Sequence, residues 1–370
     1  MEPYIPDTLP LDSIDWAAHV SLIGQANAAL ARYDGMLQGI VNPRLFLSPL
    51  ATQEAVLSSR IEGTQASMEE VLEYEAGPRE EVEPSKYADI QEIINYRQAM
   101  GQAVESLEKR PLCLNLIKEL HAILLDSVRG RNKAPGQFRR IQNYIAPPGS
   151  PIERATFVPP APDRLLQALD NWEKYLHFDE KDGLVQLAVI KAQFEIIHPF
   201  LDGNGRLGRM LVPLFLFDKK LLSSPVFYLS AYLEAHWEAY FARLRAISQN
   251  HDWNGWIQFF LTAVVEQAAD NIDKVRDMLR LYGSMKSRMV EITHSQFAIQ
   301  ALDAIFSRPI FRGADFSAIS GIPTKQTAAT MVRQLQRAGI LKVLQPAKGR
   351  RSAMLVFPEL INLVEGRLVV

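Results

Sequence analysis

The sequence is poor in cysteine, in long hydrophobic runs and in net charge, and each shortage excludes a class of protein. Cys113 is the single cysteine among 370 residues, which excludes an internal disulfide and a structural thiolate metal site. The longest apolar stretch, Met210–Phe217, contains Pro213 and is far shorter than the roughly 18 residues of a membrane-spanning helix. Forty basic and forty-two acidic side chains leave a net charge of −2, so no overall field attracts nucleic acid or anionic lipid.

The first residues, MEPYIPDTLPLDSIDW, are acidic and interrupted by proline, without the basic and apolar regions of a signal peptide. We therefore expect a cytoplasmic protein without a membrane segment. The length and an apolar fraction of 48% are typical of about two globular domains, each with a core of its own.

Helical periodicity dominates the first 290 residues, where apolar side chains recur three and four positions apart. This pattern predicts a mainly α fold with helices at Trp16–Tyr33, Thr52–Ile61, Tyr87–Leu107, Leu114–Ser127, Asp163–His177, Gly183–Ile197, Gly205–Phe217 and Trp237–Ile247. The glutamate-rich residues 69–83 are interpreted as a solvated connector. Residues 138–162 mix β-branched and aromatic residues with Pro and Gly, which indicates a short hairpin that is either a plain connector or a flap over a substrate.

The pattern changes near residue 290. Two short helical segments, a Gly-Ile-Pro turn, a helix at Lys325–Ala338 and two apolar strands follow, with a basic turn between the strands. Residues 290–370 contain ten Lys and Arg against five Asp and Glu, so this part carries +5 and the preceding residues carry −7. The charge is therefore segregated along the chain.

One run, IHPFLDGNGRLGR, has the features of a phosphate site between two helices. Gly203, Asn204 and Gly205 allow a sharp turn whose backbone N–H groups point to one side, at the positive end of the following helix. Arg206 and Arg209 are three positions apart on one face of that helix and can bind phosphate oxygens together. The pattern predicts a site for a polyphosphate.

Two further side chains of this run fit group transfer at phosphorus. Asp202 offers a hard oxygen ligand for Mg²⁺ beside the same phosphates. His198 has a near-neutral ordinary pKa and can take the proton of an attacking hydroxyl. Phe200 is expected to be an apolar anchor beneath the loop. Together these residues predict nucleotidyl or phosphoryl transfer.

The run HPFLDGNGRLGR matches every fixed position of the Fic signature, H-x-F-x-(D/E)-G-N-G-R-x-x-R, so the chain resembles the Fic adenylyltransferases. The resemblance implies a Fic-type helical bundle that transfers AMP from ATP, with Mg²⁺, to a Tyr, Thr or Ser hydroxyl of a protein and releases pyrophosphate. It assigns His198 as the base and Asp202 as the metal ligand. The phosphate cradle would consist of Gly203, Asn204 and Gly205, and the two phosphate clamps would be Arg206 and Arg209.

The segment SSRIEG, residues 58–63, matches the inhibitory pattern (S/T)-x-x-x-E-(G/N) of the same family, on a helix at about residues 52–63. The resemblance implies that Glu62, with Ser58, is inhibitory. A carboxylate bound to Arg209 would occupy the guanidinium that should hold the γ-phosphate, and would leave ATP weakly bound or misaligned for attack. On its own, the segment also fits a helix that ends on Gly63 with a solvated Glu62.

Two further assignments follow from the resemblance. Fic proteins cover their target segment with a β-hairpin flap ahead of a VPP-like exit, and this flap corresponds here to Arg154, Ala155, Thr156 and Phe157. Tyr240 resembles an aromatic residue near the adenine in relatives, although a tyrosine on an amphipathic helix is also typical of a core.

The C-terminal part resembles the winged-helix domain that some Fic proteins append. The resemblance divides the chain into an N-terminal helical region at 1–110, a Fic catalytic core at 111–285 and a winged-helix-like domain at 290–370. Winged helices bind DNA or mediate protein contacts. The side chains that could bind duplex phosphates are Lys325, Arg333, Arg337, Lys348, Arg350 and Arg351.

The sequence thus predicts an autoinhibited, Mg²⁺-dependent protein adenylyltransferase whose partner is a protein substrate, the chain itself included. Two alternatives stay open. In one, the same site removes AMP from a modified protein, with Glu62 orienting a water. In the other, the chain is a nucleotide-sensing regulator that binds DNA. Inhibition can come from the same chain or from a second copy, so a homodimer also stays open.

Overall fold

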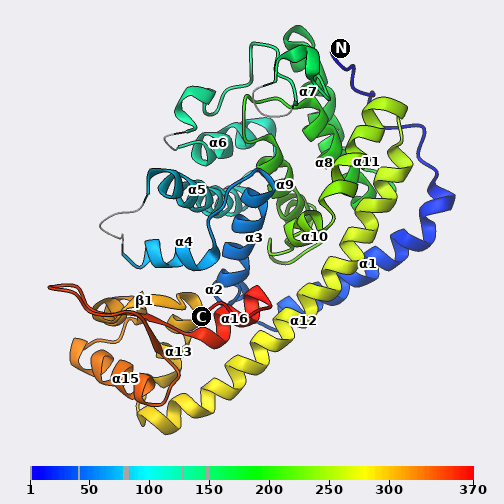
Figure 1. The fold of residues 1–370 in the computed structure, drawn as a ribbon. Helices are drawn as coiled ribbons and strands as arrows, with labels where there is room; N and C mark the ends of the chain where they lie inside the picture. Colours follow the sequence, from blue (N-terminus) through cyan, green and yellow to red (C-terminus); the bar gives the residue numbers. More distant parts are fainter. Residues whose placement is uncertain (1, 41, 78–82, 127–128, 147–149) are drawn as a thin grey trace. The chain divides into compact units, whose positions relative to one another are not determined.

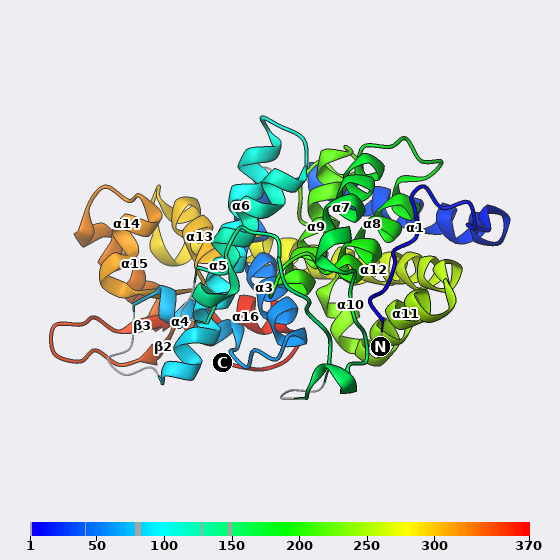
Figure 2. The same ribbon diagram turned by 90° about the horizontal axis from the view of Figure 1, so that it is seen from above.

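The computed structural model of the chain describes residues 2–40, 42–77, 83–126, 129–146 and 150–370, and it is mainly helical, as predicted (Figures 1 and 2). These residues group into two compact units that interleave along the chain. Unit 1 comprises Met1–Leu37, Leu57–Gly63 and Ile94–Ala269, and unit 2 comprises Gln38–Val56, Thr64–Ile93 and Asp270–Val370. The three consecutive domains predicted from the sequence, at 1–110, 111–285 and 290–370, stay a prediction.

Unit 1 is an assembly of helices. It contains α1 (Trp16–Gln38), α6 (Leu114–Leu124), α7 (Pro162–Leu176), α8 (Gly183–Ile197), α9 (Asn204–Asp218), α10 (Ser230–Ala235) and α11 (Trp237–Asn250), with the 3-10 turns η1 (Arg131–Lys133) and η2 (Ile152–Arg154). Parts of α3 (Ser48–Ile61), α5 (Pro84–Leu107) and α12 (Trp253–Thr293) also belong to it. All eight predicted helices form, although Ser127 lies outside the described residues. Among the helices that the structure describes, none has the length and apolar character to cross a membrane.

Helix α8 is the centre of unit 1. Every residue from Leu184 to Ile197 is buried, and α7, α9 and α11 pack around the helix. It begins where Asp182 accepts hydrogen bonds from two backbone N–H groups of the first turn, at 2.9 Å each. The indole N–H groups of Trp172 and Trp256 donate to carbonyl oxygens of α8 at 2.8 Å. The helix that carries His198 at its end is therefore fixed from several sides.

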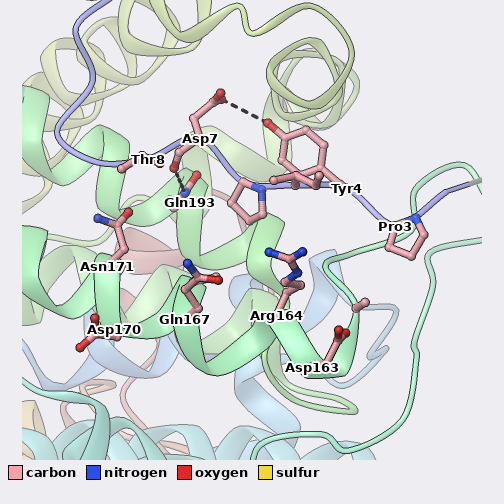
Figure 3. Close-up of a pocket in the computed structure, with 14 residues that line it drawn as sticks. Pro3, Tyr4, Asp7, Thr8, Asp163, Arg164, Gln167, Asp170, Asn171 and Gln193 are labelled. Atoms are coloured by element: carbon pink, nitrogen blue, oxygen red, sulfur yellow. Dashed lines mark hydrogen bonds between the residues drawn. The ribbon is translucent and has the colours of Figure 1, made fainter.

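The N-terminal segment lies against α7 and α8 through Asp7 (Figure 3). The backbone oxygen of Asp7 accepts from Gln193 at 2.8 Å, and its carboxylate accepts from the hydroxyl of Tyr4 at 3.2 Å and from the indole of Trp253 at 2.8 Å. A cavity of about 520 Å³ remains between this segment and α7, with Arg164 along its wall. None of the residues that line it belongs to the signature run.

Unit 2 contains a small sheet with helices around it. Its elements are α2 (Pro43–Phe46), α4 (Met68–Glu75), α13 (Ala298–Ser307), β1 (Ile310–Arg312), η3 (Gly313–Asp315), α14 (Phe316–Ser320), α15 (Lys325–Arg337), β2 (Lys342–Gln345), β3 (Met354–Val356) and α16 (Pro358–Glu365). The strands form an antiparallel sheet in the order β1-β3-β2, in which Ile310 and Lys342 both lie opposite Val356. The strands β2 and β3 agree with the prediction, whereas β1, with three residues, was not predicted.

The structure corrects the connector predicted at residues 69–83, because Met68–Glu75 is helical. Ser67 and Glu70 form a reciprocal capping box, in which the Ser67 hydroxyl accepts from the Glu70 N–H at 3.2 Å and the Glu70 carboxylate accepts from the Ser67 N–H at 3.0 Å. Val71 is fully buried. Residues 78–82 lie outside the described part of the chain.

The hairpin predicted within residues 138–162 consists, in its described part, of one antiparallel bridge between Ile145 and Phe157. The Ile145 oxygen accepts from the backbone N–H and the hydroxyl of Thr156, at 2.8 and 3.0 Å. Arg154 ends η2, and Ala155 is buried. Pro159 and Pro160, which follow the bridge, have no N–H to donate to a longer ladder. Residues 147–149, at the predicted tip, lie outside the described residues.

Candidate active site

The signature run forms a tight loop between α8 and α9. Helix α8 ends at His198 in a left-handed conformation (φ 50°), ahead of a proline, and α9 begins after Gly203, which is also left-handed (φ 76°). Phe200 is fully buried beneath the loop, as predicted, and stacks on His121 with ring centroids 3.8 Å apart. The amide of Asn204 accepts from the Phe200 N–H and donates to the Phe200 oxygen, both at 2.9 Å. The Asn204 side chain is therefore used within the loop, and only its backbone is available to a phosphate.

His198 is held as a neutral base. Its Nδ1 lies 3.2 Å from the carbonyl oxygen of Glu195. A carbonyl oxygen only accepts, so Nδ1 carries the proton and Nε2 keeps a free lone pair. Burial lowers the pKa of His198, against the opposing effects of the Glu195 carbonyl and the Glu62 carboxylate. The imidazole is thus ready to accept a proton at neutral pH.

Two residues that the sequence analysis missed fix the backbone of His198. The guanidinium of Arg139 is buried and donates to the carbonyl oxygens of His198 at 2.9 Å and Pro160 at 2.5 Å. Burial lowers its pKa to about 10. Asn143 donates to the His198 oxygen at 3.4 Å and to the Phe200 oxygen at 3.0 Å. These contacts join residues 139–160 to the signature loop, and no local sequence pattern signals them.

Arg209 is bound by the helix that precedes Glu62. Its Nε donates to the Ser58 hydroxyl at 2.8 Å, and its Nη2 donates to the Ser58 carbonyl at 2.8 Å and to Glu62 Oε1 at 2.6 Å. The side chain of Arg209 is 1% exposed and that of Glu62 is 39% exposed. Burial opposes the charge of Arg209, but the carboxylate of Glu62 holds the pKa of Arg209 above its ordinary value. The structure thus brings together Ser58, Glu62 and Arg209, which are about 150 positions apart in sequence.

The carboxylate of Glu62 lies at the start of α9, where a bound anion would be expected. A Cβ on Gly205 would overlap Glu62 Oε1, so this position accommodates the carboxylate only as glycine. Burial would raise the pKa of Glu62, but Arg209, and more weakly Arg206 and His198, lower it, so Glu62 is ionised. Glu62 is therefore an anion at a helix N-terminus, the type of position that binds phosphate in other proteins.

Asp202 and Arg206 lie at the mouth of the loop. Asp202 Oδ1 accepts from the Gly203 N–H at 2.6 Å and lies 3.3 Å from Arg206 Nη2. The Asp202 side chain is 44% exposed, while that of Arg206 is nearly buried. One exposed carboxylate beside a phosphate site is the donor set that Mg²⁺ uses when substrate oxygens and waters complete its shell. The residues present therefore fit a magnesium ion that arrives with a nucleotide.

Tyr240, assigned by resemblance to the adenine, lies in the core of unit 1 with 0% exposure. Its hydroxyl donates to Glu195 at 2.5 Å and accepts from Lys191 at 2.9 Å, and Lys191 donates to Glu195 at 2.7 Å. Burial lowers the pKa of Lys191, and Glu195 opposes this shift. A Cβ on Gly208 would lie 2.5 Å from Glu195 Oε1, so the carboxylate also packs against α9. Tyr240 therefore presents no ring face to a nucleotide in this conformation.

Comparison with known families identifies the chain. A profile described as Fic/DOC family N-terminal matches residues 20–105, and a profile of the Fic/DOC family matches residues 111–216, so the two together match more than half of the chain. The second match includes the whole signature run. The fold and the loop thus define a Fic-type protein. The chain belongs to the Fic/DOC family.

Two curated relatives illustrate this similarity. Protein adenylyltransferase Fic of Drosophila grimshawi is 31% identical over 206 residues, which are 52% of this chain and 36% of that protein. A probable protein adenylyltransferase of Aquifex aeolicus is 27% identical over 182 residues, or 48% of this chain and 51% of that protein. The chain therefore matches only about a third and a half of the length of these relatives.

Solved structures share the fold. A Fic family protein from Desulfovibrio desulfuricans superposes with a TM-score of 0.58 at 19% identity, over 96% of this chain and 98% of that chain. Fic-1 from C. elegans superposes with a TM-score of 0.53 at 18% identity, over 70% of this chain and 72% of that chain.

Proposed function

We propose that the chain is an autoinhibited protein adenylyltransferase that uses ATP and Mg²⁺ in the cytoplasm. The ion pair between Glu62 and Arg209 carries the proposal, because a carboxylate binds the guanidinium that would hold a phosphate in the site of His198. The relatives named protein adenylyltransferases support the type of reaction. In this proposal residues 111–285 are the catalytic core, and residues 1–110 supply the inhibitory helix.

The chemistry follows from the loop. Backbone N–H groups at the start of α9 hold the phosphates with Arg206 and Arg209. His198 Nε2 takes the proton of the acceptor hydroxyl as the hydroxyl oxygen bonds to the α-phosphorus. The bond from that phosphorus to the pyrophosphate oxygen breaks, and pyrophosphate leaves. Asp202 would hold Mg²⁺, which neutralises phosphate charge when bound.

Glu62 acts as the brake in this scheme. Its carboxylate occupies the anion position at α9 and binds the guanidinium that would otherwise hold the γ-phosphate. A triphosphate must displace it or bind with its α-phosphorus out of line with the incoming hydroxyl. Relief of inhibition therefore requires that Glu62 leave Arg209, within one chain or through a second copy in a homodimer.

The partner in this reaction is a protein with a Tyr, Thr or Ser hydroxyl, the chain itself included. The segment Arg154–Phe157 would hold an extended stretch of the target through main-chain hydrogen bonds, as the bridge between Ile145 and Phe157 suggests. Such contacts fix the hydroxyl with little dependence on the target's side chains.

Labelling with ATP that carries the label at the α-phosphate tests the proposal. The purified chain, alone and with a cell lysate, should transfer label to protein, and His198→Ala should abolish the transfer. His177→Ala removes an exposed histidine at the end of α7 and should label like the wild type. Equal labelling by His198→Ala and the wild type would refute the proposed mechanism.

A second candidate reaction uses the same site to remove AMP from a modified protein. It is favoured by the partial exposure of Glu62, whose carboxylate meets both solvent and the anion position and is able to orient a water. Release of AMP from a pre-labelled protein, lost in Glu62→Gly, distinguishes this reaction from transfer. Under the transferase proposal, Glu62→Gly raises labelling instead.

A further inference from the structure

Six of the ten basic residues of the C-terminal part, residues 290–370, lie on one helix and one turn. Helix α15 contains three basic residues and no acidic one. Its apolar face, centred on Met331 and Leu335, is buried, so its polar face is fixed toward solvent. The exposed residues of that face are Lys325, Gln326, Ala329, Thr330, Arg333 and Arg337.

The basic side chains of α15 are not committed to carboxylates. Within the described part of the chain, Arg333 bonds only to its own helix, to the Ala329 oxygen at 3.3 Å and the Thr330 hydroxyl at 3.1 Å. Among the described residues, neither Lys325 nor Arg337 has an acidic partner within ion-pair distance. The positive charge on this face is therefore available to an external anion.

The turn between β2 and β3 adds a second basic element. Lys348 and Arg351 pair through their backbones, with N–O distances of 3.1 and 3.0 Å, around Gly349 in a left-handed conformation (φ 58°). This closed turn exposes Lys348 and Arg350. The backbone pairing holds the two side chains on a defined protrusion.

The acidic helix of unit 2 lies on a different side of the sheet. In Figure 1, α4 lies above the strands and α15 lies below them. Glu73 of α4 is buried and accepts from Gln345 at the end of β2 at 3.0 Å. The carboxylate of Glu73 is thus hydrogen-bonded inside unit 2. The exposed face of α15 carries positive charge, and α15 itself contains no acidic residue.

We propose that α15 and the β2–β3 turn form a surface that binds duplex DNA. The small residues Ala329 and Thr330 let the helix approach the floor of a major groove, where Gln326 and Thr330 can reach base edges. Arg333 and Arg337, with the side chains of the turn, bind the flanking phosphates. The proposal is independent of the adenylyltransferase proposal.

Other polyanions fit this surface less well. The exposed face of α15 has no large apolar side chain to enter a lipid headgroup layer, which argues against a membrane. The deep, narrow major groove of double-stranded RNA does not admit a helix. Duplex DNA offers both the groove width for α15 and phosphates spaced along its edges.

Fluorescence anisotropy with a labelled 20-base-pair duplex of random sequence, titrated with the full chain at several salt concentrations, tests the proposal. Binding should weaken steeply with salt. The double variant Arg333→Gln/Arg337→Gln should weaken binding by about eightfold per lost phosphate contact at 0.1 M salt, and should reduce the slope of log K against log salt by about two. Lys348→Gln/Arg350→Gln should act similarly.

Arg276→Gln/Arg280→Gln is the matched control, because it removes the same charge from α12, where both arginines pair with aspartates of their own helix. It should bind DNA like the wild type. Circular dichroism should show that all variants are folded. Absence of duplex binding at 0.05 M salt, an equal loss in the control, or tighter binding of double-stranded RNA or anionic vesicles would overturn the proposal. His198→Ala should leave DNA binding unchanged, which separates this result from the test of adenylyl transfer.

Discussion

Replacing Glu62 by glycine should strengthen ATP binding and raise adenylyl transfer. In the structure, Arg209 donates to Glu62 Oε1 at 2.6 Å, and that carboxylate also fills the anion position beside Gly205. Its removal frees both the guanidinium and the position at the start of α9. The two hydrogen bonds that Arg209 donates to Ser58 remain, so the guanidinium stays in place for a γ-phosphate.

The size of the effect follows from the contact that ATP must replace. A hydrogen bond between charged groups contributes about 1.5–3 kcal/mol when it is desolvated. Because the side chain of Glu62 is 39% exposed, solvent screening reduces this value, and we expect about 1–2 kcal/mol. That free energy corresponds to about a 5- to 30-fold gain in ATP affinity. Glu62→Gln keeps a neutral hydrogen bond and should give an intermediate gain.

Isothermal titration with ATP and Mg²⁺ measures the affinity, and initial rates of α-label incorporation measure the transfer. Glu234→Gln is the control, because Glu234 pairs at 3.7 Å with Arg60 of α3, the helix that precedes Glu62. The side chain of Glu234 is about as exposed as that of Glu62. This substitution should change neither quantity. ATP affinity in Glu62→Gly that is equal to or weaker than in the wild type would refute the assignment of Glu62 as a competitor of the triphosphate.

Three further predictions concern residues around the loop. Because burial lowers the pKa of His198, its base form persists below the ordinary value near 6.5, so the labelling rate should stay constant from pH 8 down to pH 6.5; a half-maximal rate at or above pH 6.5 would contradict this. Arg139→Met removes the donor to the His198 carbonyl and should lower the transfer rate about tenfold with ATP affinity in titration unchanged, whereas a loss of both together would assign Arg139 to general stability. Gly208→Ala places a Cβ against Glu195 and should lower the free energy of unfolding by about 1–3 kcal/mol in urea denaturation; Gly101→Ala, whose Cβ meets nothing within 4 Å, should not, and equal stabilities would contradict the packing account.

The parts of the fold that the sequence predicted are those with a local pattern. The predicted helix Gly183–Ile197 forms with those bounds, because a capping aspartate precedes it and a proline follows its end. The structure shows a capping box at Ser67 and Glu70, whereas the many glutamates of that segment favour a connector. The segment is helical in the structure, with Val71 packed in the core. The burial of such a short segment depends on tertiary packing, which the local sequence does not specify.

The residues of the candidate site also divide into those with a recognisable sequence pattern and those without one. The contact of Glu62 with Arg209 was predictable because both motifs match a family pattern, and the contact of Ser58 with Arg209 is added by the structure. The role of Arg139 was not predictable, because Arg139 donates to the carbonyl oxygen of His198, about 60 positions away. Any residue type offers a backbone carbonyl, so such a contact leaves no pattern in the sequence. For Tyr240, the sequence allowed either a contact with the adenine or a position in the core. The hydrogen bond from Tyr240 to Glu195 lies in the core.

The central claim is that His198 transfers AMP when Glu62 no longer blocks the site. Intact-mass spectrometry tests it most directly, by comparing Glu62→Gly with Glu62→Gly/His198→Ala after each is incubated with ATP, Mg²⁺ and lysate. The account predicts an added adenylate on the chain or on a lysate protein with the first variant and none with the second. An adenylate adduct formed equally by both, or by neither, would contradict it.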